Sequence, residues 1–189
     1  IQGELELRRN ACKTDEIILT TGIHGLSKLG FMIQNKINFD SDFSLNKKLI
    51  SKSIEQFCRP KVYPNFLNNL LKTRPNKKIK KIGCTDSSDG LFQAIQDLAI
   101  ASNCKAIINY DKIPKDKHWP KGDKWDEYYF FGGEDYELVF SLPAKWAKSL
   151  TKLDQNINEI GFFTNGEPSI EFKDNKKNNL LDNKPFKHF

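Results

Sequence analysis

Residues 84–91 constrain this chain more than any other stretch, because an apolar run passes there directly into the acids Asp86 and Asp89 and a glycine. Beyond the glycine, apolar side chains return every three to four residues, which is the period of an amphipathic helix. The pattern therefore predicts a strand that leads into a helix beginning near Ser88 or Asp89 and ending near Asn103.

The two acids lie where the expected helix begins, and this position allows two interpretations. Backbone N–H groups and the positive end of the helix dipole attract phosphate oxygens, and Asp86 and Asp89 could then hold Mg²⁺ between protein and phosphate. Alternatively, Ser88 or Asp89 only caps the helix, which is the commoner use of serine and aspartate at such a position. The residues of this stretch leave both interpretations open.

The composition is typical of a soluble globular protein. With 189 residues, of which 38% are hydrophobic, the chain can bury one core, and we expect residues 1–189 to form one domain. The net charge of +6 comes from dispersed lysines, which indicates a solvated surface and argues against a nucleic-acid partner. Because every apolar run is shorter than the ~20 residues that a bilayer requires, no membrane partner is expected.

The four cysteines indicate the compartment. They form no Cys-x-x-Cys pair and lack the histidine spacing of a zinc site, so we expect reduced thiols, no disulfide and a cytoplasmic protein. The sequence begins at Ile1 without a methionine, and we interpret it as part of a longer polypeptide.

Hydrophobic periodicity predicts alternating strands and helices elsewhere. Residues 17–21 form a β-branched strand that turns through glycines into a helix, and the missing Walker spacing favours tight turning over phosphate binding for those glycines. His24 is one lone imidazole in that turn, and we interpret it as a turn residue. Other expected elements are a helix over 44–57 capped by Ser44, a helix over 64–72, a strand over 106–110 and a loop over 112–124.

A second polar motif lies at residues 132–135, where two glycines and the acids Glu134 and Asp135 precede a run with the period of a strand. The glycines free the backbone, and the carboxylates come at the start of the strand. An ordinary turn with solvated acids is the alternative. The remaining pattern predicts a helix over 143–153 and a terminal unit over 157–189, in which strands 157–164 and 169–172 form a hairpin followed by a polar tail.

Strands and helices alternate early and strand-rich segments close the chain, so we expect an α/β sandwich with helices packed on a mixed β-sheet. The motifs resemble those of the C-terminal domain of the thiamine-monophosphate kinase family, within the superfamily of aminoimidazole ribonucleotide synthetase. Residues 86–91 are similar to its D-x-S-D-G-L motif, and residues 132–138 match its G-G-E-D-Y-E-L motif in full, which sister families lack. Weaker similarities cover Arg9 with residues 11–13, the turn at 21–30, and the helix end at Arg59 and Pro60.

The resemblance implies roles for six residues by their position in these motifs. Mg²⁺ would be bound by Asp86 and Asp89. ATP would be contacted by Arg9 and Ser88, and the substrate by Glu134 and Phe186. Phe186 stands where the family has an aromatic residue near its C-terminus.

The implied reaction is the ATP-dependent phosphorylation of thiamine monophosphate to thiamine diphosphate. The chain would be the C-terminal half of the enzyme, and the N-terminal nucleotide- and metal-binding domain of the same polypeptide would be its partner and the main interface of a homodimer. The chain alone is then expected to be inactive. Two alternatives stay open: another ATP-dependent enzyme of the superfamily, and a binding half that does not catalyse.

Overall fold

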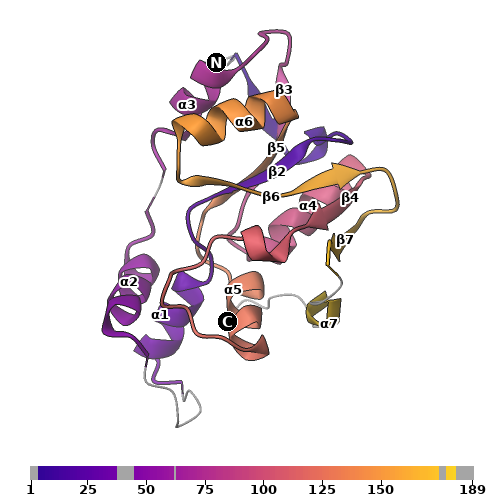
Figure 1. Ribbon diagram of the computed structural model, residues 1–189. Coiled ribbons are helices and arrows are strands. Elements are labelled where there is room, and N and C mark those ends of the chain that lie inside the picture. Colours follow the sequence, from indigo (N-terminus) through magenta and orange to yellow (C-terminus); the bar gives the residue numbers. More distant parts are fainter. Residues whose placement is uncertain (1–3, 38–44, 62, 175–177, 182–189) are drawn as a thin grey trace.

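The computed structural model describes residues 4–37, 45–61, 63–174 and 178–181, which form an α/β sandwich. A seven-stranded mixed sheet runs through its middle in the order β1-β3-β5-β2-β6-β4-β7 (Figure 1). β1 pairs with β3 and β4 with β7 in parallel, and the other neighbours are antiparallel. The strands are β1 (Glu6–Arg8), β2 (Ile17–Thr21), β3 (Lys81–Asp86), β4 (Lys105–Ile108), β5 (Leu138–Leu142), β6 (Ile157–Thr164) and β7 (Ser169–Phe172).

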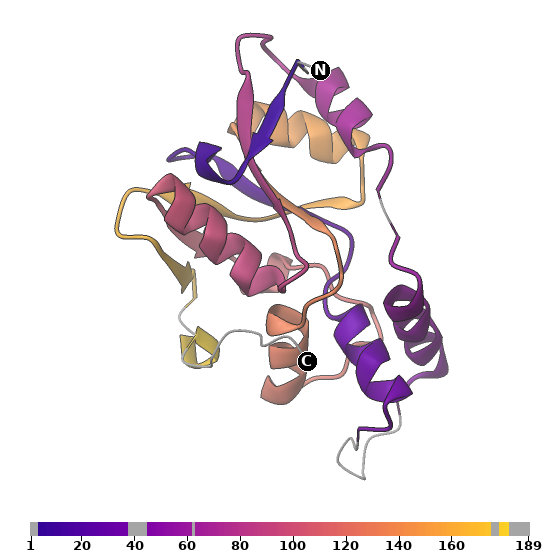
Figure 2. The ribbon, with the colours of Figure 1, turned by 180° about the vertical axis from the view of Figure 1, so that it is seen from behind.

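Helices cover both faces of this sheet (Figure 2). α3 and α6 lie on one face, α4 and α5 pack on the other, and α1 and α2 pack against each other beside α5. None of the described helices is long and apolar enough to cross a membrane. The helices are α1 (Leu26–Gln34), α2 (Lys47–Cys58), α3 (Phe66–Thr73), α4 (Leu91–Ser102), α5 (Asp123–Phe131), α6 (Ala144–Leu153) and α7 (Asn178–Leu181), with 3-10 turns η1 (Arg9–Ala11) and η2 (Tyr110–Lys112).

Two hydrophobic cores lie on opposite faces of the sheet, because successive strand side chains point in opposite directions. Ile18 and Val139 are fully buried on the face that α4 and α5 cover, whereas Leu19 and Phe140 are fully buried on the face that α3 and α6 cover. The central strands β2 and β5 therefore bury both of their faces. The candidate residues lie beside the ends of these strands.

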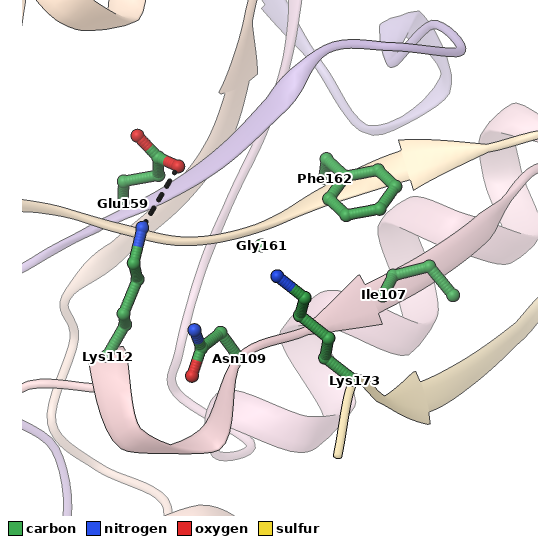
Figure 3. A pocket seen from close by; sticks show the side chains of 7 residues that line it. All are labelled: Ile107, Asn109, Lys112, Glu159, Gly161, Phe162 and Lys173. Carbon is green, nitrogen blue, oxygen red and sulfur yellow. Dashed lines mark hydrogen bonds and ion pairs between the residues drawn. The ribbon is translucent and has the colours of Figure 1, made fainter. Parts of the chain in front are cut away.

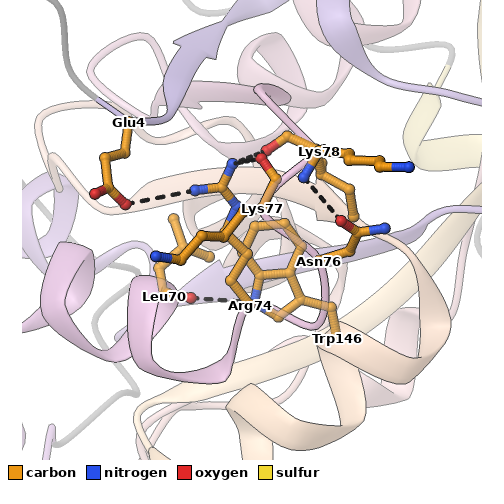
Figure 4. A network of polar contacts seen from close by, with 8 residues as sticks. Glu4, Leu70, Arg74, Asn76, Lys77, Lys78 and Trp146 are labelled. Atoms are coloured by element: carbon orange, nitrogen blue, oxygen red, sulfur yellow. Dashed lines mark hydrogen bonds and ion pairs between the residues drawn. The ribbon is translucent and has the colours of Figure 1, made fainter.

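Arg74 holds the connection that leads from α3 into β3, and its side chain is only 4% exposed. Its Nη2 atom donates to the carbonyl oxygens of Lys77 and Ile79, and its Nη1 atom lies 3.8 Å from Glu4 Oε2 (Figure 4). These contacts tie together the connection that comes just before β3.

The predicted terminal hairpin within residues 157–189 is wrong. In the part of the chain that the structure describes, β6 and β7 each pair with β4, which lies between them, and not with each other. The connection at residues 165–168 has to cross two strand spacings, roughly 10 Å, which four extended residues can span. Turn residues reveal only that the chain reverses, whereas the pairing of β4 with both strands shows that β4 lies between them.

Three elements with regular secondary structure have no counterpart in the sequence-based expectation, and one cap differs from it. β1 forms within a stretch that reads as polar and basic, α5 begins inside the predicted loop over 112–124, and the short α7 lies in the predicted polar tail. The Oδ1 atom of Asn46 caps α2 by accepting the backbone N–H of Lys48 at 2.9 Å. Ser44, the predicted cap, lies outside the described residues.

Candidate active site

The C-terminal end of β3 and the start of β5 lie side by side and bring the two polar motifs together. Asp86 is the last residue of β3 that pairs with β5. Backbone groups join the two adjoining loops, because Ser87 N donates to Glu137 O and Glu134 N donates to Ser88 O, both at 2.8 Å. Candidate residues from the two motifs therefore share one surface.

Gly90 occupies the N-cap position of α4, so the interpretation of Ser88 or Asp89 as the cap is wrong. Gly90 has φ 96° and ψ 161°, and a Cβ atom there would lie 2.8 Å from Phe131 O. Glycine has no side chain, so the N-cap residue itself makes no side-chain capping bond. α4 begins directly after the loop that carries the acids, and the first N–H groups of a helix are suited to bind phosphate oxygens. The predicted end of the helix near Asn103 is confirmed.

Three carboxylates gather around the phenol of Tyr136, which is 44% exposed. Its hydroxyl donates to Glu134 Oε2 at 2.5 Å, and this bond is the main reason that the pKa of Tyr136 is raised. Burial and the negative charges of Glu134, Asp86 and Asp89 raise that pKa further. The site is thus an open, negatively charged surface at the end of the sheet.

The donor set fits Mg²⁺ as an ion that protein and phosphate share. Asp86 and Asp89 are half-buried carboxylates on one short loop. Nowhere in the described parts of the chain do three or more His, Cys, Asp or Glu side chains form a metal-binding group. Mg²⁺ commonly takes one or two protein carboxylates and completes its shell with water and phosphate oxygens. Two carboxylates beside the start of a helix match that chemistry.

Arg9 reaches the same end of β3 from η1. Its Nε atom donates to Thr85 Oγ1 at 3.0 Å, and its Nη1 atom lies 3.5 Å from Asp97 Oδ2 on α4. The guanidinium is therefore held beside the residue that precedes Asp86. Phe186, the second expected substrate contact, lies outside the described residues.

A buried polar network beneath the site involves residues that the sequence analysis does not single out. Thr21 Oγ1 donates to Glu137 Oε2 at 2.5 Å and accepts the backbone N–H of Leu138 at 2.9 Å. Burial raises the pKa of Glu137, and the bond from Thr21 opposes that shift. Gly22 packs so closely on this carboxylate that a Cβ atom would lie 1.9 Å from Glu137 Oε1. The glycines of this turn serve tight turning and close packing, as predicted.

Successive residues of the 132–138 motif differ in their burial. Asp135 is fully buried, whereas Glu134 is half-buried and Tyr136 is exposed. The alternative of an ordinary turn with solvated acids is therefore wrong for Asp135. Burial raises the pKa of Asp135 to about 7, although hydrogen bonds from backbone N–H groups act in the opposite direction. The two adjacent glycines and the paired acids were the available sequence signal for this residue.

His24 is fully buried within the turn after β2. Its Nε2 atom lies 2.7 Å from Thr20 Oγ1, and its Nδ1 atom has no hydrogen-bond partner among the described residues. Burial lowers the pKa of His24 to about 3. The folded chain therefore keeps this imidazole neutral, and it serves as a structural residue of the turn.

We expect His24 to make the fold sensitive to acid. The stabilising contribution of its neutral form is complete above the unfolded pKa of about 6.5 and is lost as the pH falls toward 3, because only the unfolded chain gains the proton. From pH 7 to pH 5 the loss amounts to about 2 kcal/mol. Denaturant titrations of the wild type and His24→Gln should reveal it as a pH-dependent difference in the free energy of unfolding.

The partly exposed His118 provides the control for this measurement. His118→Gln removes a histidine outside the turn after β2, so it shows what the loss of a histidine does when His24 is kept. Parallel stability curves for the wild type and His24→Gln between pH 7 and pH 5 would contradict the assignment.

A small cavity lies elsewhere on the molecule, over β4 and β6 (Figure 3). Its volume is about 70 Å³, and Lys112 Nζ and Glu159 Oε1 form an ion pair of 3.3 Å at its rim. Phe162, which is 39% exposed, and Lys173 line it as well. The cavity shares no residue with the candidate site.

Comparison with known families decides where the chain belongs. Residues 13–173 match the family described as AIR synthase related protein, C-terminal domain. The chain belongs to this family. The match includes both motif loops and the strands that carry them, while Arg9 lies just before it.

Curated relatives of this AIR synthase related domain are named thiamine-monophosphate kinase. The protein of Prochlorococcus marinus is 32% identical over 188 residues, which cover 100% of this chain and 56% of the relative. That of Nitrosopumilus maritimus is 30% identical, with 96% and 56% covered. The chain spans about half the length of the curated relatives it matches. These relatives confirm the family resemblance of the motifs.

Solved structures confirm the expected fold class of this AIR synthase related domain. The structure of AaThiL complexed with AMPPCP and TMP aligns with a TM-score of 0.71 and 25% identity over 97% of this chain and 54% of that chain. The thiamine-monophosphate kinase from Stenotrophomonas maltophilia K279a aligns with a TM-score of 0.66 and 20% identity, over 88% and 52% of the two chains. At that identity the second likeness concerns the fold alone.

Proposed function

We propose that the chain is the C-terminal half of an enzyme that transfers the γ-phosphoryl group of ATP to thiamine monophosphate, which yields thiamine diphosphate. The observation that carries the proposal is the meeting of two motif loops at one surface, in a chain whose relatives bear the name thiamine-monophosphate kinase. The complex of AaThiL with AMPPCP and TMP supports it as well. The full-length polypeptide, meaning this chain preceded by an N-terminal half like that of its relatives, would be the active form.

The phosphate end of the site would be formed by the 86–91 loop. Asp86 and Asp89 would hold Mg²⁺, which neutralises charge on phosphate oxygens. Ser88 and the first N–H groups of α4 would bind phosphate oxygens directly. Arg9, held beside Thr85, would add a fixed positive charge on the nucleotide side. Such a transfer depends on positioning and charge neutralisation more than on covalent chemistry.

The thiamine end of the site would be formed by Glu134 and Phe186. The Glu134 carboxylate would accept a hydrogen bond from the aminopyrimidine, and the Phe186 ring would stack on the flat cationic heterocycle. Glu134 follows two glycines, so a ligand can approach the backbone closely.

The remaining parts of the enzyme would come from outside this chain. The N-terminal domain of the same polypeptide would supply further Mg²⁺ carboxylates and the main interface of a homodimer. The four free cysteines support a reducing compartment, and we place the enzyme in the cytoplasm.

Glu134→Ala and Phe186→Ala are expected to raise the KM of the full-length polypeptide for thiamine monophosphate by up to about 150-fold, while the KM for ATP changes little. The reason is that each variant removes a contact to the thiamine end. A lost buried polar contact, such as that of Glu134, costs about 1 to 3 kcal/mol, and a lost cation–π contact, such as that of Phe186, costs about 0.5 to 2 kcal/mol. Steady-state kinetics with each substrate varied in turn would measure the effect.

Glu167→Ala is the matched control, because Glu167 is an exposed acid in the 165–168 connection. It should leave both KM values unchanged. Equal weakening of both substrates by Glu134→Ala would assign the thiamine end to other residues. A wild-type polypeptide that binds ATP and thiamine monophosphate without forming thiamine diphosphate would favour the binding half that does not catalyse.

A further inference from the structure

Asp135 ties the 132–137 loop to two helices. Its carboxylate accepts the backbone N–H of Gly25 at 2.5 Å and that of Ser27 at 2.9 Å, at the start of α1. Its carbonyl oxygen accepts Gln56 Nε2 of α2 at 3.1 Å. The side chain is fully buried. One residue of the motif is thus fastened at its side chain and at its backbone.

The residues on either side of Asp135 adopt a conformation that such an attachment has to maintain. Glu134 has φ 69° and Tyr136 has φ 55°. Residues other than glycine rarely occupy this left-handed region, and they stay there only where surrounding contacts hold them. Because Asp135 lies between the two, its bonds to α1 and α2 are suited to hold both.

This conformation determines how Glu134 is presented. Its backbone N–H donates to Ser88 O at 2.8 Å, and its carboxylate accepts the Tyr136 hydroxyl at 2.5 Å. The first bond links the substrate end of the site to the loop of Asp86 and Asp89. If the 132–137 loop changed its conformation, the Glu134 side chain would lose its orientation, and its backbone N–H would lose the hydrogen bond to Ser88 O.

We propose that Asp135 is a positioning residue that holds Glu134 in place for the substrate through the start of α1. The role in substrate binding rests on the proposed function, whereas the effect on the conformation of Glu134 does not. The competing explanation is that the Asp135 carboxylate only caps α1 and stabilises the fold. The two explanations differ in what happens to Glu134 when the carboxylate is weakened.

Asp135→Asn separates them, because its amide presents one acceptor oxygen where the carboxylate presents two to the N–H groups of Gly25 and Ser27. In the 189-residue chain, we expect the backbone N–H of Glu134 to exchange its hydrogen about tenfold faster in the variant than in the wild type. This N–H donates to Ser88 O and not to the side chain that is substituted. In the full-length polypeptide, we expect the KM for thiamine monophosphate to rise about tenfold, with kcat and the KM for ATP within about threefold of the wild type.

Asp154→Asn is the matched control. Asp154 is also buried and follows α6, where its carboxylate accepts the Tyr63 hydroxyl, Asn69 Nδ2 at 2.8 Å and Asn156 N at 3.1 Å. It belongs to the opposite face of the sheet and touches neither motif loop. A comparable loss of stability with unchanged Glu134 exchange and unchanged KM is therefore expected.

Faster exchange at Gly25 and Ser27 alone, with Glu134 unchanged, would overturn the proposal and leave a helix cap. If Asp135→Asn does not fold, Gln56→Met removes the other attachment of the same residue from a half-buried helix position, and unchanged Glu134 exchange in that variant would overturn the proposal equally. Should the wild type form no thiamine diphosphate, the proposed function fails, while the exchange measurements still decide whether Asp135 positions Glu134.

Discussion

Asp86→Asn and Asp89→Asn are each expected to lower kcat of the full-length polypeptide by about 100- to 1000-fold, which corresponds to about 3 to 4 kcal/mol of transition-state stabilisation. Each variant removes one negative charge that would be directed at Mg²⁺ and leaves the size of the side chain unchanged. The stability of the fold should change little, because the N-cap residue of α4 is Gly90 and not one of the two aspartates. The free energy of unfolding should therefore change by less than about 1 kcal/mol.

Turnover and thermal melting, measured on the same preparations, would test this separation. Asp111→Asn is the control, since Asp111 is exposed beyond β4, four strand positions or roughly 19 Å across the sheet from β3. It should change neither quantity. If Asp86→Asn or Asp89→Asn melts much earlier yet keeps the normal rate per folded molecule, that aspartate is structural.

The 189-residue chain alone is expected to form no measurable thiamine diphosphate from ATP, Mg²⁺ and thiamine monophosphate. Phosphoryl transfer requires charge neutralisation on both sides of the phosphates. The described part of the chain offers two carboxylates on one open loop and no group of three metal-binding side chains. The chain also spans only about half the length of its curated relatives.

A coupled assay of product formation, with circular dichroism to establish that the chain is folded, would measure this. The positive control is the full-length polypeptide under identical conditions. Turnover by the chain alone at a rate comparable with that of the full-length polypeptide would contradict the expectation and place the complete catalytic machinery within these 189 residues.

The local pattern of the sequence was sufficient to locate most elements. β2 lies where a short β-branched apolar run predicts a strand that is buried on both faces. α4 and α6 lie where their hydrophobic periods predict, because each buries one side of a regular helical repeat. The sequence pattern did not predict α5, for the opposite reason. Its aromatic side chains Trp125, Tyr129, Phe130 and Phe131 are buried around much of its circumference, so no clear helical period distinguishes them from a loop.

The local sequence pattern did not predict which strands pair with one another. Asn165 and Gly166 indicate a reversal, but whether β6 then meets β7 or β4 depends on which strand has filled the neighbouring position in the sheet. β1 likewise becomes a strand only because β3 offers it a parallel edge. Pairing partners are long-range choices that a turn signal does not encode.

For the candidate site, the sequence by itself determined the residue types and their order in two motifs. Only the tertiary structure decided that the two motif loops meet, because the pairing of β3 with β5 places them side by side. It also decided that Gly90 rather than Ser88 or Asp89 occupies the start of α4, and that Asp135 points inward while its neighbours face outward. The physical reason is that the sequence shows an aspartate or a glutamate in the same way whether its carboxylate is buried against backbone N–H groups or exposed to a ligand. Only the packing of the folded chain determines which of the two environments the carboxylate has.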